Sequence, residues 1–181
     1  MEELSYQIEI SARHVHLSAD TLAQLFGAGA KLNPVRPLTV VGEFKSDKFV
    51  TIVGPKRSFE RVAVLGPVRR QTQVEISTTD SYALGIPDVP VRLSDDLAGS
   101  APVRLVGPAG AVDLPEGLII AKRHLHINQT DMQKYGLRPG QTVDITGGTT
   151  RAVTFHEVVV RESKVPYPVV HLDTDEGNAI K

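Results

Sequence analysis

The stretches RHVH (residues 13–16) and RHLH (residues 123–126) place four of the chain's six histidines in two copies of one pattern. In a β-strand, residues i and i+2 point to the same face of the sheet. His14 and His16 would therefore present two imidazoles side by side, and the second pair would do the same. In an α-helix the two rings would lie roughly 200° apart, so the spacing favours a shared ligand only in a strand.

The sequence around the two histidine pairs has one common layout. HVHLSADTLAQLFG (residues 14–27) and HLHINQTDMQKYG (residues 124–136) each run from a strand through H-x-H and an apolar residue to a helix cap, a short helix and a glycine. Ser18 and Asn128 are the predicted N-caps, and a glycine ends each helix. The chain therefore contains an internal repeat of supersecondary structure.

Short runs rich in β-branched residues, separated by 15 glycines and 12 prolines, make up most of the remaining sequence. Such runs indicate a mainly β protein built of barrels or sandwiches. Only the two helices that follow the histidine pairs are expected. The Gly- and Pro-rich segment VGPAGAVDLPEG (residues 106–117) is either a linker or a hairpin turn.

Composition limits the chemistry that this chain can use. The 181 residues have a formal net charge of −1, so no global positive field would attract nucleic acid or an anionic membrane. The chain has no cysteine, which excludes disulfides and thiolate ligands. It has no long apolar run, and its first residues lead directly into a strand pattern. A soluble intracellular protein is expected, with no nucleic-acid or membrane partner.

Two imidazoles provide half of a zinc site, and a third ligand would leave one position open for substrate or water. Glu75, in the alternating stretch QTQVEIS, and His171, at the end of PVVHL, are candidates for that third ligand. Sequence spacing equally allows each to be a buried side chain that is satisfied by hydrogen bonds.

Four stretches together resemble one family, the PduL-type phosphotransacylases or phosphate propanoyltransferases. They are SARHVHLS (11–18), LGPVRRQTQVEIS (65–77), AKRHLHIN (121–128) and HLDTDEGNA (171–179), and the similarity covers almost the whole chain. The resemblance implies two divalent metal ions, normally zinc, that lie close together. It assigns His14, His16 and Glu75 to one ion and His124, His126 and His171 to the other.

The resemblance also implies the fold and its domains. The family has two β-barrels capped by short helices, which fits the internal H-x-H repeat. One barrel is expected to combine the first strand with the C-terminal part, residues 4–12 plus 121–181, and the central barrel to comprise residues 13–120. A long N-terminal extension targets some family members to microcompartments, and its absence favours a cytoplasmic location. The oligomeric state is not fixed by the sequence, and a homo-oligomer stays open.

The activity implied by the resemblance is the reversible conversion of short-chain acyl-CoA and phosphate to acyl phosphate and CoA. Arg69 matches the arginine on the phosphate side, although Arg69 and Arg70 could also form a solvated strand end. The positions that contact CoA in the family are Ser11, Arg36, Leu65 and Asn178. Phosphate is expected to attack the thioester directly. Two alternatives stay open, a dizinc hydrolase of a thioester or phosphoester and a non-catalytic, zinc-stabilised β-barrel binding module.

Overall fold

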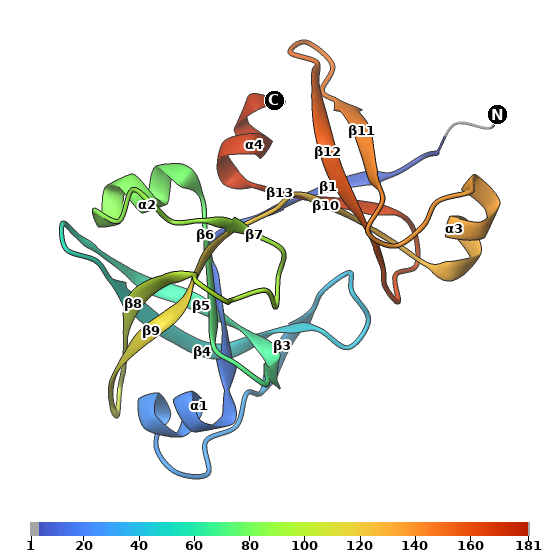
Figure 1. Ribbon diagram of the computed structural model, residues 1–181. Coiled ribbons are helices and arrows are strands. Elements are labelled where there is room, and N and C mark those ends of the chain that lie inside the picture. Colours follow the sequence, from blue (N-terminus) through green and yellow to red (C-terminus); the bar gives the residue numbers. More distant parts are fainter. Residues whose placement is uncertain (1–3, 181) are drawn as a thin grey trace. The chain divides into compact units, whose positions relative to one another are not determined.

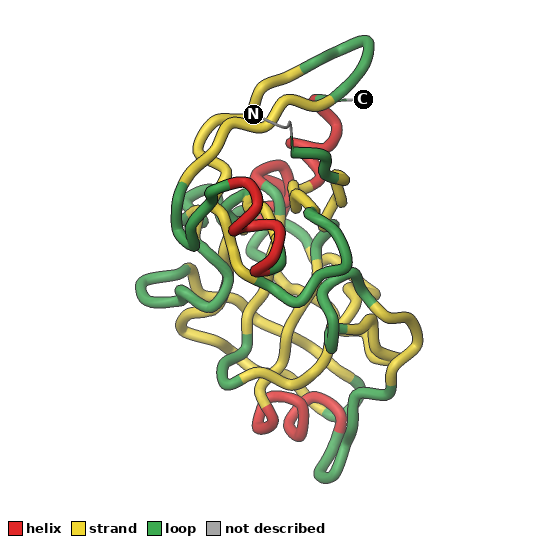
Figure 2. Tube along the Cα trace, turned by 90° about the vertical axis from the view of Figure 1, so that its right-hand side faces the viewer, coloured by secondary structure: helices red, strands yellow, loops and turns green. Residues whose placement is uncertain are grey.

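The computed structural model describes residues 4–180, and strands dominate it, with 49% of residues in strands and 16% in helices. Figures 1 and 2 show long strands connected by loops and a few short helices. The predicted fold class was mainly β, with two β-barrels capped by short helices and an internal H-x-H repeat. The mainly β class, the short helices, the H-x-H motifs and one closed six-stranded barrel are confirmed. Lys181, the last residue of the predicted C-terminal domain, lies outside the described residues.

The chain divides into two units, and its N-terminal strand belongs with its C-terminal part. Of the described residues, unit 1 comprises 4–11, Thr39–Val41 and 122–180. Unit 2 comprises Ala12–Leu38 and Gly42–Ala121. The chain therefore passes from one unit to the other just before each of the two RHxH stretches.

Unit 2 contains a closed six-stranded barrel. Its strands are β2 (His14–Ser18), β4 (Phe44–Val53), β5 (Ser58–Arg69), β6 (Gln73–Ile76), β8 (Ala101–Gly107) and β9 (Gly110–Ala121). The pairing order is β4-β5-β2-β6-β9-β8, and β8 pairs with β4 to close the ring. Two short strands extend the sheet, β3 (Pro34–Pro37) beside β4 and β7 (Val91–Arg92) beside β9.

Unit 1 contains a five-stranded sheet with the order β1-β13-β10-β12-β11. The strands are β1 (Gln7–Ser11), β10 (His124–Ile127), β11 (Thr142–Gly147), β12 (Val153–Glu162) and β13 (Val169–Asp173). The first strand of the chain, β1, pairs in parallel with β13, the last strand. The strand β10, which carries the second histidine pair, lies between β12 and β13.

The two units repeat one pattern of strand pairing. In unit 2 the order β4-β5-β2-β6-β9 alternates antiparallel, parallel, antiparallel and parallel pairs. In unit 1 the order β11-β12-β10-β13-β1 alternates in the same way. The register also agrees, because His14 stands opposite Glu75 and His124 stands opposite His171. The internal repeat predicted from the H-x-H layout therefore extends to strands that the sequence pattern did not connect.

Four helices occur in the described part of the chain, two more than expected. The predicted helices α1 (Ala19–Phe26) and α3 (Gln129–Tyr135) begin after Ser18 and Asn128, whose side chains accept hydrogen bonds from backbone N–H groups of the first turn. The expectation of only two helices was wrong. Capping boxes start the additional helices α2 (Thr78–Leu84) and α4 (Thr174–Ala179), each of fewer than eight residues.

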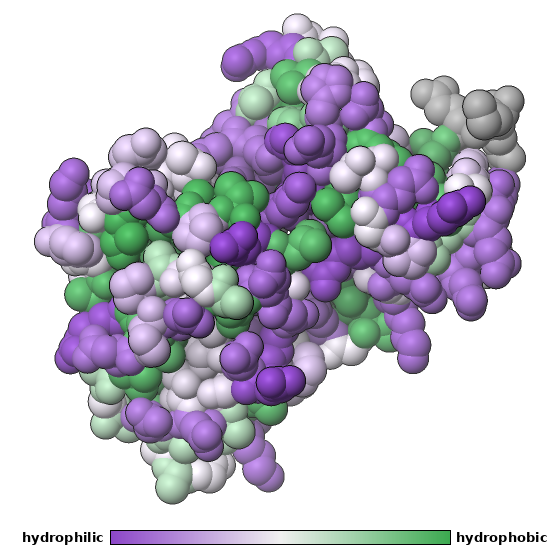
Figure 3. Space-filling view, in the orientation of Figure 1, coloured by the Kyte–Doolittle hydropathy of each residue, from purple (hydrophilic) through white to green (hydrophobic). Residues whose placement is uncertain are grey.

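Each unit has its own apolar core, formed largely by residues of its strands and completed by residues of its helices. Val15, Ile52, Leu105 and Leu118 are completely buried in unit 2. The core of unit 1 includes Leu125, Ile127, Val158, Val170 and Leu172. On the face drawn in Figure 3, hydrophobic residues form small groups among hydrophilic ones. The β-branched runs of the sequence thus supply the inward-facing side of the strands.

The Gly- and Pro-rich segment 106–117 is a hairpin and not a linker, because Gly107 pairs with Gly110 where β8 turns into β9. The close approach of α1 explains one of these glycines. A Cβ atom on Gly107 would lie 2.5 Å from the carbonyl oxygen of Leu25. Within residues 4–180, the helices are too short or too polar to cross a membrane.

Candidate functional site

The first group of potential metal ligands lies in unit 2, on the antiparallel strands β2 and β6. His14 and His16 project from the same face of β2, and Glu75 stands opposite His14 on β6. The three residues are only 2 to 8% exposed. Each offers one ligand atom, and these atoms all lie within 4.8 Å of one another. Strand spacing and strand register together produce this convergence.

The surroundings of His14 fix the orientation of its ring. Nδ1 lies 2.9 Å from the carbonyl oxygen of Ala12, and Nε2 lies 3.5 Å from Oε2 of Glu75. Burial alone would lower the pKa of His14, but the charge of Glu75, its hydrogen bond and the Ala12 carbonyl together raise that pKa. Nδ1 is therefore engaged by the backbone, and Nε2 faces the acidic partner.

His16 has the opposite electrostatic character. Burial lowers the pKa of its imidazole well below the usual range, and the positive charges of His14 and Arg69 lower it further. Among the described residues, its Nδ1 is buried without a hydrogen-bond partner. A neutral imidazole is the form that binds metal. The lowered pKa keeps the ring of His16 neutral and therefore able to bind a cation.

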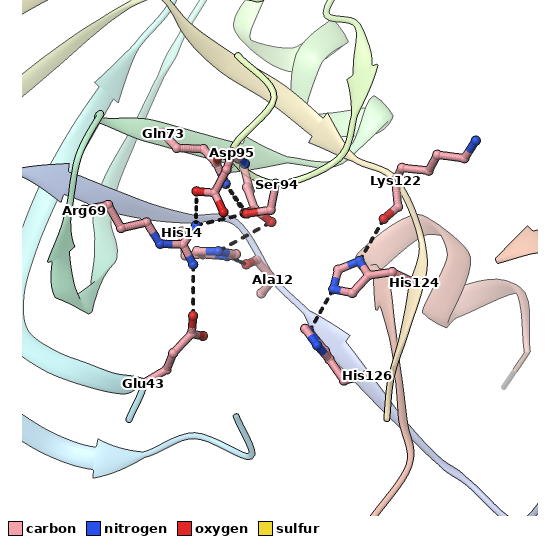
Figure 4. Close-up of polar contacts among 11 residues, drawn as sticks. Ala12, His14, Glu43, Arg69, Gln73, Ser94, Asp95, Lys122, His124 and His126 are labelled. Atoms are coloured by element: carbon pink, nitrogen blue, oxygen red, sulfur yellow. Dashed lines mark hydrogen bonds and ion pairs between the residues drawn. The ribbon is translucent and has the colours of Figure 1, made fainter. Parts of the chain in front are cut away.

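The second group lies in unit 1 and consists of His124 and His126 on β10 and His171 on β13. Their ligand atoms also lie within 4.8 Å of one another. Nε2 of His124 and Nε2 of His126 are 3.0 Å apart, and Figure 4 shows these two rings pointing toward each other. Their Nδ1 atoms contact the Lys122 carbonyl oxygen at 2.8 Å and Ser163 Oγ at 2.6 Å. Both rings thus present Nε2 to the same point.

Both groups fit a divalent cation of the zinc type. Nitrogen and carboxylate oxygen are suitable donors for zinc, and three protein ligands leave a position open for substrate. The engaged Nδ1 atoms of His14, His124 and His126 match the outer contacts that usually orient metal-binding imidazoles. Without a cation, two imidazole nitrogens 3.0 Å apart would have to share one proton. The donor sets predicted from the sequence are each brought together in one unit.

Arg69 lies at the end of β5 in a network of polar side chains beside the first group. Its Nη2 donates to Glu43 at 3.0 Å, while its Nη1 donates to Ser94 at 3.0 Å and to Asp95 at 3.3 Å (Figure 4). Ser94 in turn donates to Oε1 of Glu75 at 3.3 Å. The guanidinium is therefore positioned by two carboxylates and connected to a metal-ligand candidate through one hydroxyl.

The residues expected to contact CoA fall on four elements. In unit 2, Arg36 on β3 is opposite Lys45 on β4, which is opposite the half-buried Leu65 on β5. In unit 1, Ser11 ends β1, and the exposed Asn178 lies on α4. Arg36 and Leu65 are thus aligned across three adjacent strands, while Ser11 and Asn178 both lie where the β1–β13 pair ends.

Sequence reasoning missed several residues that support these groups. Gln73, which is 1% exposed, donates a short hydrogen bond to Glu75 and a 2.8 Å hydrogen bond to Ser94. Gln73 precedes Glu75 by two residues, so strand periodicity places it on the same face and could have identified it. Ser94, Glu43 and Ser163 are distant in sequence from the residues they contact, and no local pattern marks them.

A family model described as phosphate propanoyltransferase matches residues 7–181. A phosphate propanoyltransferase of Lachnoclostridium phytofermentans is 45% identical to this chain, over 96% of this chain and 81% of its own length. A phosphate propanoyltransferase of Priestia megaterium is 47% identical, over 94% of this chain and 78% of its own length. The chain belongs to the phosphate propanoyltransferase family. A phosphate propanoyltransferase of Thermotoga maritima is 44% identical over 95% of this chain and 82% of its own length.

Membership of the phosphate propanoyltransferase family confirms the resemblance that the four motifs indicated. It also confirms the predicted enzyme class, an acyltransferase. The similarity extends along nearly the whole chain, so both units and all the candidate residues fall within it.

Proposed function

We propose that this chain interconverts short-chain acyl-CoA and phosphate with acyl phosphate and CoA, and that the reaction depends on two divalent metal ions. The observation that carries the proposal is the presence of two three-ligand groups, buried except for the half-buried His171, in a phosphate propanoyltransferase family member. One ion would be held by His14, His16 and Glu75, and the other by His124, His126 and His171. Zinc is favoured because all donors are nitrogen or carboxylate oxygen.

The metal ions would supply positive charge that polarises phosphate and thioester oxygens. The protein residues then have separate roles. Ala12, Lys122 and Ser163 contact the Nδ1 atoms of three imidazoles and so orient these rings. Gln73 donates a hydrogen bond to the carboxylate of Glu75 and orients it. The rigid orientation of these ligands lowers the reorganisation needed when substrate binds.

Arg69 is the proposed phosphate-binding residue. A guanidinium can bind two oxygens of one phosphate through parallel N–H donors. In the structure, Glu43 and Asp95 accept hydrogen bonds from the two ends of this fork. Phosphate would replace these carboxylates, and Ser94 would keep the guanidinium in place through its hydroxyl contact.

The CoA contacts and the domain division remain part of the same proposal. Ser11, Arg36, Leu65 and Asn178 would contact CoA, with Arg36 supplying the only positive charge among them. The two domains would comprise residues 4–12 plus 121–181 and residues 13–120. The strand pairing of β1 with β13 supports this division.

CoA release from acetyl-CoA and propanoyl-CoA, measured with and without phosphate, tests the proposed reaction. Release is expected only with phosphate, and a chelator should abolish it until zinc is restored. Release without phosphate would instead identify a hydrolase, because water would then be the acceptor. An intact fold with no turnover under any of these conditions would favour a binding module. His156→Gln is a suitable control, because His156 is 70% exposed and belongs to neither group.

A further inference from the structure

The repeated strand pairing gives each third ligand a partner at the same place. In unit 2, Glu75 on β6 stands opposite Ile119 on β9, and both strands run in parallel. In unit 1, His171 on β13 stands opposite Glu9 on β1, also in parallel. Glu9 and Ile119 therefore occupy equivalent positions beside the third ligand, yet one is acidic and the other is completely buried and apolar.

The difference between these partners follows the chemistry of the ligand. Glu75 is a carboxylate, and it receives hydrogen bonds from Gln73 on its own strand and from Ser94. The residue equivalent to Gln73 on β13 is Val169, which is completely buried and has no polar side-chain atom. His171 thus obtains its polar partner from the neighbouring strand β1, where unit 2 has the apolar Ile119.

Glu9 makes direct contact with the imidazole of His171. Its Oε2 lies 3.1 Å from Nε2 of His171. Thr39 donates a short hydrogen bond to the other carboxylate oxygen of Glu9. The hydroxyl thus holds the carboxylate in the orientation in which it faces the ring.

We propose that Glu9 is a positioning residue for the metal site of unit 1: it accepts the Nε2 proton of His171 and directs Nδ1 of that ring to the cation. His124 and His126 would bind through Nε2, because their Nδ1 atoms contact Lys122 and Ser163. The site would thus use two Nε2 donors and one Nδ1 donor. This inference rests on the metal-dependent function proposed above.

A carboxylate partner affects both the orientation and the basicity of a metal-binding imidazole. It fixes the tautomer with Nε2 protonated, so the nitrogen offered to the metal carries its lone pair in every molecule. Loss of such a partner typically weakens metal binding about 10- to 100-fold. A purely structural role for Glu9, limited to the pairing of β1 with β13, would leave metal affinity unchanged.

The tautomer of His171 in the zinc-loaded protein tests the geometry directly. Long-range ¹H–¹⁵N NMR spectra, assigned with His171→Gln, should show His171 protonated at Nε2 and His124 and His126 protonated at Nδ1. A His171 ring protonated at Nδ1 would overturn the proposal, because the nitrogen beside Glu9 would then be the one that binds zinc.

Cobalt binding tests the effect on affinity without the use of enzyme turnover. Titration of the full chain with Co²⁺ against a competing chelator should resolve two binding steps. Glu9→Ile introduces the residue found at the equivalent position of unit 2. In this variant the Co²⁺ affinity of one of the two binding steps should fall about 10- to 100-fold. Glu9→Gln should weaken it by about threefold or less, because the amide oxygen still accepts the Nε2 proton.

The controls separate failure of this inference from failure of the metal proposal. Glu60→Gln removes one carboxylate from an exposed position of β5 and should leave both steps unchanged. Unaltered Co²⁺ affinity in Glu9→Ile would refute the role of Glu9 while the metal site remained valid. Absence of any Co²⁺ binding by the wild-type protein would refute the metal site itself.

Discussion

Arg13 binds Asp80 through two hydrogen bonds, from Nη2 to Oδ1 at 2.6 Å and from Nε to Oδ2 at 2.9 Å. Asp80 is 4% exposed and belongs to the capping box that starts α2, directly after the strand that carries Glu75. In unit 1, Arg123 binds Glu176, the corresponding capping-box residue of α4, at 2.7 Å. In each unit, the arginine beside a histidine pair thus anchors the helix that follows the third ligand.

Arg13→Lys is expected to lower the free energy of unfolding by about 1 kcal/mol, because lysine keeps the charge but loses one of two hydrogen bonds to a buried carboxylate. Arg13→Ala should cost about 2 kcal/mol, since Asp80 then lacks its charged partner. Urea unfolding at saturating zinc measures both effects. Arg104→Lys is the control, because Arg104 and Asp113 form an exposed pair whose loss should change stability by less than about 0.5 kcal/mol. Equal effects of the two lysine variants would contradict the anchoring role.

Local sequence patterns predicted the parts of the fold that depend on neighbouring residues. The H-x-H spacing and the caps Ser18 and Asn128 correctly located two strands and the helices that follow them. The helices α2 and α4 were missed because fewer than two turns give little apolar periodicity and neither helix follows an H-x-H pair, the context that identified the equally short α3. The sequence feature that could have identified the starts of these helices is their capping boxes, Ser77 with Asp80 and Asp173 with Glu176.

Contacts between distant residues could not be predicted from the sequence alone. Glu9 and His171 are separated by 162 residues and meet only because β1 pairs with β13. Arg69 and Ser94 likewise meet through the folding of unit 2. The H-x-H spacing indicated four of the six proposed ligands and named Glu75 and His171 as candidates, and the resemblance to a family assigned all six to two ions. The residues that orient those ligands are known only from the three-dimensional contacts.

About two metal ions per chain are expected, one for each group of three ligands. Elemental analysis of protein purified without chelator measures the content. His16→Ala and His126→Ala should each lose about one ion, because two remaining ligands bind a divalent cation much more weakly. His156→Gln should retain both ions. Full activity in protein with well below one ion per chain would exclude metal dependence.

Arg69→Lys should reduce turnover by about 10²- to 10³-fold without loss of folding, because an ammonium group cannot reproduce a two-point grip on phosphate. The matched control is Arg70→Lys, since Arg70 is the next residue and is exposed. Steady-state kinetics at saturating acyl-CoA and varied phosphate compare the two variants, with circular dichroism to verify folding. A near wild-type rate in Arg69→Lys would make Arg69 an ordinary charged residue at a strand end.

Asp47 gives the protein a pH-dependent contribution to stability. Hydrogen bonds from Lys48 and Asn33 lower the pKa of Asp47 to about 2, below the usual 3.8. A lowered carboxyl pKa stabilises the folded state above about pH 4, and that contribution is lost as pH falls toward 2. Because the pair is exposed, Asp47→Asn should cost only about 0.5 kcal/mol at pH 7. Thermal unfolding measured at pH 7 and pH 2 should show a difference in stability between wild type and Asp47→Asn only at pH 7.

One contact bears on whether the reaction passes through an acyl-enzyme. Enzymes that form one usually employ a cysteine, or a serine activated by histidine. The chain has no cysteine, but Ser163 Oγ lies 2.6 Å from Nδ1 of His126, a pair that the sequence did not predict. If Nε2 of His126 binds metal, Nδ1 carries the proton and donates it to Ser163. In that state His126 cannot remove a proton from the hydroxyl.

Direct attack of phosphate on the thioester is therefore expected. A phosphate oxygen bonds to the carbonyl carbon, the carbon–sulfur bond breaks, and CoA leaves as a thiolate with no intermediate on Ser163. Both substrates must then be bound together, so double-reciprocal plots should intersect and no burst of CoA should precede phosphate addition. At saturating zinc, Ser163→Ala should keep turnover within about tenfold of wild type, since serine only orients His126. A labelled acyl group that forms on the wild-type protein from acyl-CoA alone, and is absent in Ser163→Ala, would establish covalent catalysis instead.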